Sequence, residues 1–400
     1  MKTNEPKSIA LVANSSWYIY NLRLGLIRAL KEASFSVTVL APKDDFSERF
    51  MEEGCRYIEI EINGMGTDPV EDFVYCYNLM RIYRKHRFYY VFHYTIKPNI
   101  YGPVAAAVHG IPSTSIISGL GYSFINKGVF NFFIKMLYKI ATYLADEVWF
   151  VNPDDKKLFE AHNIVSTCKA KLLPGEGVNT LHFSPQKDRI SATKANHFIF
   201  CGRLIWTKGV GEFIEAARLI KAQHPEATFS ILGFLHVNNP DAIPAEVIEA
   251  WQKEGVAQYL GATDDVRPFL EAASCLVLPS YYGEGTPRSL LEASSMKVPV
   301  ITTDQVGCRE VVRDGYNGFL CNKKDVADLA QKMDRFVRMP FDERLRLGEN
   351  GRRLVKEKFD EAFVIQHYLD KTSKAGTTRR STEKGRKLLA AALAFTKPRP

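Results

Sequence analysis

Two glutamates, Glu284 and Glu292, stand eight positions apart directly after the apolar run "CLVLPS". Glu284 lies in a short Gly-rich loop, and Thr286 with Pro287 is typical of the cap and first turn of a helix. Glu292 then falls on the second helical turn, where apolar and small neighbours indicate a packed surface on which a carboxylate needs a partner. The alternative is that Glu292 only favours the helix and faces solvent. Because a carboxylate can accept hydrogen bonds from both hydroxyls of a vicinal diol, the two residues together suit a polyol ligand.

Two cations, Arg203 and Lys208, lie in a second candidate loop, within "FCGRLIWTKGVGEFIEAA". The pattern predicts a buried strand that ends at Gly202 and a helix that begins near Gly209. Free N–H groups and the helix dipole would add to the two side-chain charges and form an anion site. A solvated turn is the alternative. A diphosphate on the two cations, with ribose and hexose hydroxyls on the two glutamates, describes a nucleotide sugar.

Strand-like and helical segments alternate along the chain, which predicts an α/β fold with parallel sheets and helices on both faces. We expect two Rossmann-like, doubly wound domains that face a cleft, over residues 1–180 and 194–355. A helix over 356–370 should pack back toward the first domain, and a disordered basic tail should follow over 371–400. Ligands of such sheets bind at the carboxyl ends of the strands. The predicted strands are "IALVAN", "SVTVLAP", "CRYIEIEI", "YYVFHYT", "STSIIS", "EVWFVN", "AKLLP", "HFIFCG", "TFSILG", "CLVLPS" and "VPVITTD".

Several common motifs are absent from the sequence. No G-x-G-x-x-G, P-loop, H-E-x-x-H or G-x-S-x-G occurs, and no Asp-x-Asp offers a carboxylate pair for a metal and a diphosphate. The seven cysteines are scattered, with no C-x-x-C, which favours reduced thiols in a cytosolic protein and argues against zinc. The opening "MKTNEPK" leads straight into a predicted strand, so no signal peptide is expected.

The net charge of +8 is concentrated at one end of the sequence. Residues 371–400 hold nine basic residues and one acid, which leaves the rest of the chain neutral. This basic tail is either simply solvated or attracted to an anionic membrane surface. Residues 122–144 carry three lysines, no acid and many aromatic residues, so they predict a helix that lies in a membrane interface, with a core helix as the alternative. The sequence shows no basic stripe interleaved with aromatic residues, so a nucleic-acid partner is not expected.

The Glu-x7-Glu spacing, "GRLIWTKGV", "LPGEGVNTLHFSP" and "VPVITTDQVGCREVVRDGYNGFL" closely resemble the retaining glycosyltransferases of family four, which have the GT-B fold. The runs "HYTIKPNIYG" and "SGLGYSFINKG" are similar to a subgroup that builds bacterial capsule, O-antigen and lipid-linked oligosaccharides. The resemblance implies a UDP-sugar donor and a sugar on a polyprenyl diphosphate as the acceptor. It also implies a cytoplasmic enzyme, peripheral on the inner membrane, that uses no metal or other cofactor.

The resemblance also implies roles for individual residues. Arg203 and Lys208 would hold the donor diphosphate and stabilise the leaving UDP, Glu284 would contact the donor sugar near its anomeric carbon, and Glu292 would bind the ribose. Leaving-group stabilisation of this kind is worth roughly a hundredfold to a thousandfold in rate per donor group. The other donor-side candidates are Gly202, Gly283, Gly285, Thr286, Pro287, Arg288, Ser15 and Ser16.

The first half departs from the family pattern at two strand ends. Many members have a catalytic histidine where this chain has Ser118 and Gly119, and many have a Gly-Gly loop where it has Asn14, Ser15 and Ser16. The acceptor-side candidates are therefore His93, Lys97, Asn14 and Gly119. A structural role is the alternative for a lone strand-end histidine such as His93.

Three other functions suit the same fold. A UDP-sugar epimerase would turn over the donor without an acceptor. A phosphorylase would need a lysine for pyridoxal phosphate, for which no motif is seen. A non-catalytic nucleotide-sugar-binding protein is disfavoured by the intact set of Arg203, Lys208, Glu284 and Glu292.

Overall fold

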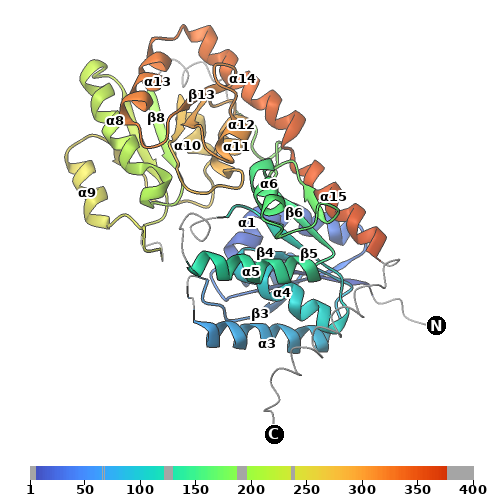
Figure 1. The fold of residues 1–400 in the computed structure, drawn as a ribbon. Coiled ribbons are helices and arrows are strands. Elements are labelled where there is room, and N and C mark those ends of the chain that lie inside the picture. Colours follow the sequence, from blue (N-terminus) through green and yellow to red (C-terminus); the bar gives the residue numbers. More distant parts are fainter. Residues whose placement is uncertain are drawn as a thin grey trace. The chain divides into compact units, whose positions relative to one another are not determined.

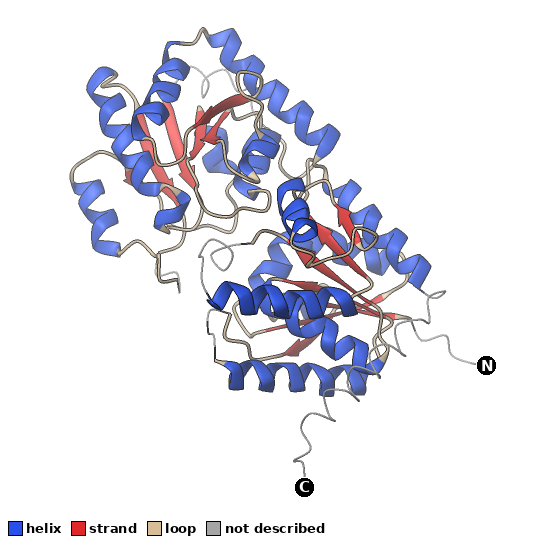
Figure 2. Ribbon diagram, viewed as in Figure 1, coloured by secondary structure: helices blue, strands red, loops and turns tan. Residues whose placement is uncertain are grey.

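The computed structural model describes residues 6–64, 66, 68–120, 129–186, 196–235 and 239–375. The chain divides into two compact units (Figure 1). The first comprises residues up to Gly175 together with those from Val364 onward, and the second comprises Glu176–Phe363. Each unit is built on one parallel sheet, and Figure 2 shows helices on both sides of each sheet. The predicted α/β class with two Rossmann-like domains is therefore confirmed.

The first unit contains a seven-stranded sheet in the order β3-β2-β1-β4-β5-β6-β7, and every neighbouring pair is parallel. Each strand-like segment predicted in this half of the chain forms one of these strands. Their bounds are β1 Ser8–Val12, β2 Ser36–Ala41, β3 Arg56–Glu59, β4 Tyr90–Tyr94, β5 Ser113–Ile117, β6 Glu147–Phe150 and β7 Ala170–Leu172.

The helices of the first unit cover two faces of this sheet because side chains alternate along each strand. Ile9 and Leu11 of β1 face the core that contains residues of α1 and α15, whereas Ala10 and Val12 face the core that contains residues of α3 and α4. The helix bounds are α1 Ser16–Glu32, α2 Arg49–Glu52, α3 Pro69–His86, α4 Ile96–His109, α5 Val129–Leu144, α6 Pro153–Ala161 and α15 Glu361–Lys374.

The second unit contains a six-stranded parallel sheet in the order β10-β9-β8-β11-β12-β13. Its strands are β8 His197–Cys201, β9 Thr228–Leu232, β10 Gln258–Tyr259, β11 Cys275–Leu278, β12 Val300–Thr303 and β13 Gly318–Cys321. β10 and β13 were not predicted, because β10 is only two residues long and β13 consists of four residues in a Gly-rich segment. The helices are η2 Trp206–Lys208 (a 3-10 turn), α8 Val210–Gln223, α9 Ala245–Lys253, α10 Arg267–Ala272, α11 Arg288–Ser295, α12 Cys308–Val311, α13 Val326–Arg338 and α14 Phe341–Lys358.

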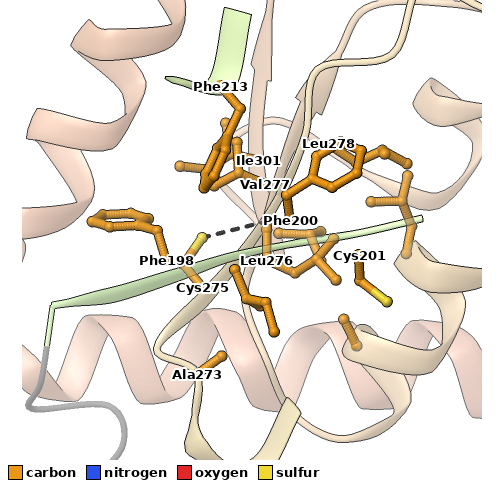
Figure 3. Packing of buried hydrophobic residues seen from close by; sticks show 14 of the residues in the cluster. Phe198, Phe200, Cys201, Phe213, Ala273, Cys275, Leu276, Val277, Leu278 and Ile301 are labelled. Atoms are coloured by element: carbon orange, nitrogen blue, oxygen red, sulfur yellow. Dashed lines mark hydrogen bonds between the residues drawn. The ribbon is translucent and has the colours of Figure 1, made fainter. Parts of the chain in front are cut away.

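The core of the second unit is rich in aromatic side chains, which fix the strands that carry the site. Figure 3 shows Phe198 and Phe200 of β8 and Phe213 of α8 close to the β11 residues. The Phe198 ring stacks on Phe229 of β9 with centroids 5.5 Å apart. Cys275 lies in the same core, where its thiol donates to the Leu276 carbonyl oxygen at 3.6 Å and burial raises the pKa of the thiol. All seven cysteines are free.

Both sheets reverse their strand order at an internal point. The reversal falls between β1 and β4 in the first unit and between β8 and β11 in the second. Loops that leave the carboxyl ends of such a strand pair run in opposite directions and leave a crevice, where doubly wound sheets bind their ligands. The loops that carry Arg203 and Glu284 follow β8 and β11, so the strongest sequence candidates lie at this point of the second sheet.

The C-terminal helix differs from the predicted segment 356–370. Two helices, α14 and α15, meet at Phe359–Asp360, where Val178 donates its N–H to the Phe359 carbonyl and accepts from Glu361 N–H. From Val364 onward α15 belongs to the first unit, where Tyr368 packs with its ring centroid 4.7 Å from that of Phe92.

The predicted tail, 371–400, begins inside this helix. α15 continues to Lys374 because Thr372 extends its buried face and Lys371 pairs with Glu147 at 2.9 Å. Residues 376–400 lie outside the described residues. Within the described ranges, no helix is both long enough and apolar enough to cross a membrane.

Candidate active site

The loops after β8 and β11 meet through a charged pair. The Lys208 ammonium lies 2.5 Å from Oε1 of Glu284, and the two side chains are only 12% and 9% exposed. The buried Ser280 hydroxyl donates to the same carboxylate oxygen at 2.8 Å. The Glu284 carboxylate is therefore held in one orientation by a cation and a hydroxyl, both of which the fold fixes in place.

Close backbone contacts position these two loops. Tyr281 N–H donates to the Thr207 carbonyl at 2.9 Å, which ties the β11 loop to the β8 loop. Gly209 has φ +81°, and a Cβ there would lie 2.2 Å from the Pro279 carbonyl oxygen. Gly307 also has φ +81°, and its Cβ would lie 2.5 Å from the Gly285 carbonyl oxygen. Only glycine fits at these two positions, because both the left-handed backbone and the lack of space exclude a side chain.

Arg203 presents a cation beside this pair. Its guanidinium lies 5.4 Å from the centroid of the Tyr282 ring, and the Lys208 ammonium lies 5.8 Å from the same centroid. Arg203 is exposed, and no described carboxylate pairs with it. An anion that approaches the loop would therefore meet one unpaired cation, Arg203, and a second, Lys208, that is held by Glu284.

Glu292 has the partner that the sequence predicted it would need. The Arg288 Nε lies 3.2 Å from Oε1 of Glu292, four residues away on α11, and the side chains are 19% and 14% exposed. Burial raises the pKa of Glu292, and the Arg288 charge opposes this rise. Arg288 also donates to the Gly177 carbonyl at 2.8 Å. Glu292 thus faces a packed surface, which excludes the solvent-facing alternative.

The start of α11 differs by one residue from the prediction. Pro287, not Thr286, is the residue before the first helical residue, Arg288. Proline suits this place because its fixed φ is compatible with the helix entrance, where its missing N–H is of no consequence. Gly285, Thr286 and Pro287 are buried in the loop, and Gly283 is half-buried. Gly202 follows the last residue of β8, and the amides of the first turn of α11 lack intrahelical acceptors.

The first-unit residues predicted on the donor side have structural partners. Ser15 caps α1 and accepts from Tyr18 N–H at 3.3 Å. Ser16 is buried and donates to the Pro42 carbonyl at 2.7 Å. Asn14 N–H donates to Oγ1 of Thr95 at 3.2 Å, which joins the loop after β1 to the loop after β4.

The predicted acceptor-side residues have contrasting environments. His93 is fully buried, its Nε2 lies 2.9 Å from the Tyr83 hydroxyl, and burial lowers its pKa to about 3. This geometry favours the structural alternative for His93. The Lys97 ammonium is paired with Asp72 at 2.5 Å, at the start of α4. Gly119, with φ +119°, follows β5 at the same edge of the sheet.

Three features of the sites were not predicted from the sequence. Thr95 has φ 64° and ψ 170°, a backbone region that is almost restricted to glycine and that costs of order 1–3 kcal/mol. It lies at the strand-order reversal of the first sheet, and no sequence signal marks such strain. The anchoring hydroxyl of Ser280 was also missed. The Arg288–Glu292 pair could have been found, because its four-residue spacing is that of a helical ion pair.

Metal ligands are not clustered near these loops. Within the ranges that the structure describes, no group of three or more His, Cys, Asp and Glu side chains could hold a metal ion. The two loops themselves offer two cations for an anion and two fixed carboxylates for hydroxyl groups.

Comparison with known protein families matches both units. Residues 8–152 match the family "Glycosyl transferase 4-like", and residues 184–354 match "Glycosyl transferases group 1". The chain therefore belongs to the glycosyltransferases, with a 4-like domain followed by a group 1 domain, and this confirms the predicted family.

Two relatives align with most of this chain. One, from Campylobacter jejuni, is N,N'-diacetylbacillosaminyl-diphospho-undecaprenol alpha-1,3-N-acetylgalactosaminyltransferase, 27% identical over 90% of this chain and 97% of the relative. The other, from Escherichia coli, is UDP-Gal:alpha-D-GlcNAc-diphosphoundecaprenol alpha-1,3-galactosyltransferase, 23% identical over 86% of this chain and 89% of the relative.

Solved structures share the fold of this chain. A Rickettsia africae glycosyltransferase has a TM-score of 0.75 at 17% identity and covers 93% of this chain and 99% of its own. The Anabaena protein HepE, in complex with UDP, has a TM-score of 0.73 at 17% identity and covers 92% and 100%. The two units thus have the domain folds of the GT-B glycosyltransferases, as the sequence predicted.

Proposed function

We propose that this glycosyltransferase moves a hexose or an N-acetylhexosamine from a UDP-sugar to a sugar on a polyprenyl diphosphate, in the synthesis of a bacterial surface polysaccharide or glycan. The observation that carries the proposal is that two relatives, each aligned over most of its length, are both named for a diphospho-undecaprenol acceptor. Their names give N-acetylgalactosamine and galactose as the transferred sugars, so UDP-N-acetylgalactosamine and UDP-galactose are the first donors to test.

The geometry of the second unit supports a donor site at β8 and β11. In the reaction, the bond between the anomeric carbon and the β-phosphate oxygen breaks, and the leaving UDP gains negative charge. The acceptor hydroxyl oxygen bonds to the same carbon and releases its proton. Arg203 is free to receive this charge. Lys208 would exchange Glu284 for the phosphate, since a dianionic diphosphate attracts the ammonium more strongly than one carboxylate does. The released Glu284 would then accept hydrogen bonds from the donor sugar, while Glu292 would bind the ribose diol.

Retention and metal independence are parts of the same proposal. UDP-galactose carries its sugar in the α configuration, and the Escherichia coli relative that uses it is named for an α-1,3 linkage. An α product from an α donor is retention. We infer that Arg203 and Lys208 neutralise the diphosphate without a metal, as cations aimed at developing charge can do.

The acceptor would be reached from a membrane surface. On α5, five large apolar side chains are 42% to 66% exposed, whereas the opposite face is buried through Tyr138 and Ala141. The helix is thus both a core helix and an exposed apolar surface, which supports a peripheral position on the cytoplasmic face of the inner membrane. We call the exposed residues the α5 patch: Phe132, Phe133, Met136, Ile140 and Tyr143.

Two parts of the predicted membrane contact lie outside the described residues. They are residues 122–128 of the predicted interfacial segment and residues 376–400 of the basic tail. Their attraction to anionic lipid is part of the proposal. No role for nucleic acid is proposed.

The test is UDP release from a panel of UDP-sugars in EDTA, with and without a polyprenyl-diphosphate sugar. We expect release that needs both one donor and the lipid acceptor and that continues in EDTA. Release without acceptor would instead indicate hydrolysis or epimerisation. No release from any UDP-sugar would contradict the proposed donor class.

A further inference from the structure

A second exposed apolar surface lies on α3. Its members recur every three or four residues, so they form one stripe along the helix, and they are 49% to 72% exposed. The opposite face of α3 is buried through Tyr75, Leu79 and Tyr83, so the stripe is not needed for packing the core. We call these residues the α3 stripe: Val70, Phe73, Val74 and Tyr77.

The α3 stripe and the α5 patch belong to one helical layer. α3 packs on α4 and α4 packs on α5, and Figure 1 shows the three helices side by side over the first sheet. One side of α4 is apolar as well, since Tyr101, Val104 and Val108 are half-buried and follow one another along it, and the half-buried His109 lies at the end of the helix. The outer side of the layer is therefore apolar from α3 across α4 to α5.

The exposed face of α3 changes character along its length. Its first two turns carry the apolar stripe, whereas its last turns expose Arg81, Arg84 and Lys85. In a parallel sheet, the helix that precedes a strand begins at the edge where the strands end. The apolar half of α3 thus lies at the same edge of the sheet as Gly119 and the strained Thr95.

Charge at this layer is suited to an anionic surface. α5 contains Lys135 and Lys139 and no acidic residue. The exposed end of α3 is basic. Each of the three acids that flank the stripe has a partner within the protein: Glu71 accepts from Asn63 at 3.1 Å, Asp72 pairs with Lys97 at 2.5 Å, and Asp68 accepts from Val70 N–H at 2.8 Å. Aromatic and aliphatic side chains bordered by lysine and arginine are the composition of a protein surface that inserts into the headgroup region of a bilayer.

We propose that the α3 stripe and the α5 patch together form one docking surface for an anionic lipid bilayer, with α3 as a second anchor beside α5. The inference rests on the proposed function, because a polyprenyl-linked acceptor must be met at a bilayer. Two anchors on one layer fix the orientation of the first unit on the membrane, with the outer side of the helical layer toward the lipid headgroups. A single helix would leave the unit free to turn about the helix axis.

The test is sedimentation of the full chain with vesicles of phosphatidylglycerol and phosphatidylcholine, at low and high salt. The variants are Phe73→Glu with Tyr77→Glu on α3, and Phe132→Glu with Phe133→Glu on α5. Leu219→Glu on α8, a similarly exposed apolar residue of the second unit, is the matched control. We expect each pair to lower vesicle partitioning at least tenfold and the control to leave it unchanged. The pair Phe73→Ser with Tyr77→Ser shows whether loss of apolar contact alone, without added negative charge, has the effect.

Wild-type partitioning by the α3 pair would overturn the proposal. If the same variant also changed from dimer to monomer in light scattering, the occupant of the stripe would be a second copy of the chain. Vesicles without acceptor report docking alone, whereas transfer to a short-chain, water-soluble acceptor reports the proposed reaction. The α3 pair should still transfer sugar to the water-soluble acceptor. If the wild-type protein did not transfer sugar to that acceptor, the proposed reaction would be refuted and the docking result would be unaffected.

Discussion

Replacing Glu284 by Gln should make UDP bind more tightly and make transfer much slower. In the unliganded site, the Glu284 carboxylate holds the Lys208 ammonium at 2.5 Å. UDP must break this pair before its phosphates can use Lys208. The amide of the Glu284→Gln variant would keep an oxygen for the Ser280 hydroxyl, which donates to Oε1 of Glu284 at 2.8 Å in the native protein, but it would no longer compete for the cation.

The size of the effect follows from the burial of the pair. Side chains that are 12% and 9% exposed lie between a surface pair and a fully buried one. Exposed pairs are worth about 0.2–1 kcal/mol and breaking a buried pair costs about 3–5 kcal/mol. We therefore expect removal of the competitor to be worth about 1.5 kcal/mol, which is roughly tenfold in the Kd for UDP. Turnover should fall about a hundredfold to a thousandfold, because Glu284 is the proposed contact to the donor sugar.

Isothermal titration with UDP and a transfer assay would measure the two effects separately. Glu254→Gln is the control, because Glu254 is also paired, with Arg218 at 2.6 Å, but lies away from the two loops. It should change neither quantity. Weaker UDP binding by the Glu284→Gln protein, with its fold intact, would refute the idea that the carboxylate and the diphosphate compete for Lys208.

Three further predictions concern single residues. Arg203→Ala should weaken UDP binding about tenfold without lowering stability, because the guanidinium is exposed. The control, Arg346→Ala on α14, should bind UDP as the native protein does. Equal UDP affinity of the two variants would show that Arg203 is not part of the site. Burial raises the pKa of Glu292, so the folded protein favours the protonated form of this side chain. The stability that the protonated form gives is present at low pH and is lost as pH rises through the raised pKa. Arg288→Ala should raise that pKa further, and urea unfolding should then show a larger loss of stability from pH 5 to pH 8 than in the native protein; an unchanged difference would contradict the pairing. His93 has its pKa lowered to about 3, so the stability that its neutral form gives is present above pH 6.5 and lost as pH falls, by about 2 kcal/mol between pH 7 and pH 5. His93→Gln should abolish this part of the pH dependence in unfolding of the first unit, and a native-like pH profile in that variant would show that His93 is not buried as a neutral group.

The sequence predicted most of the fold because buried parallel strands are nearly continuous apolar runs. Such runs marked strands such as β1 and β6 of the first sheet, whereas β10, with two residues, is too short to show a pattern. The site was predictable where its residues lie close together in the chain. Glu284 and Glu292 share one loop and helix, and Arg203 and Lys208 share another.

What was missed depends on contacts between distant parts of the chain. His93 was predicted on the acceptor side because nothing nearby in sequence shows that its ring is enclosed by Tyr83 of α3 and the backbone of Gly102. Lys97 is neutralised by Asp72, which is on a different helix. The α3 stripe was not foreseen, because α3 is apolar on both sides and periodicity alone does not decide which side faces the core.

The most direct test of the central claim is the anomeric configuration of the product. The native protein would be incubated in EDTA with UDP-N-acetylgalactosamine or UDP-galactose and a polyprenyl-diphosphate sugar, and the new linkage would be read from the one-bond carbon–proton coupling at its anomeric carbon. We predict an α linkage on the lipid-bound acceptor, formed by the native protein and lost in the Glu284→Gln variant. A β linkage, or transfer that continues unchanged without Glu284, would contradict a retaining transfer at this site.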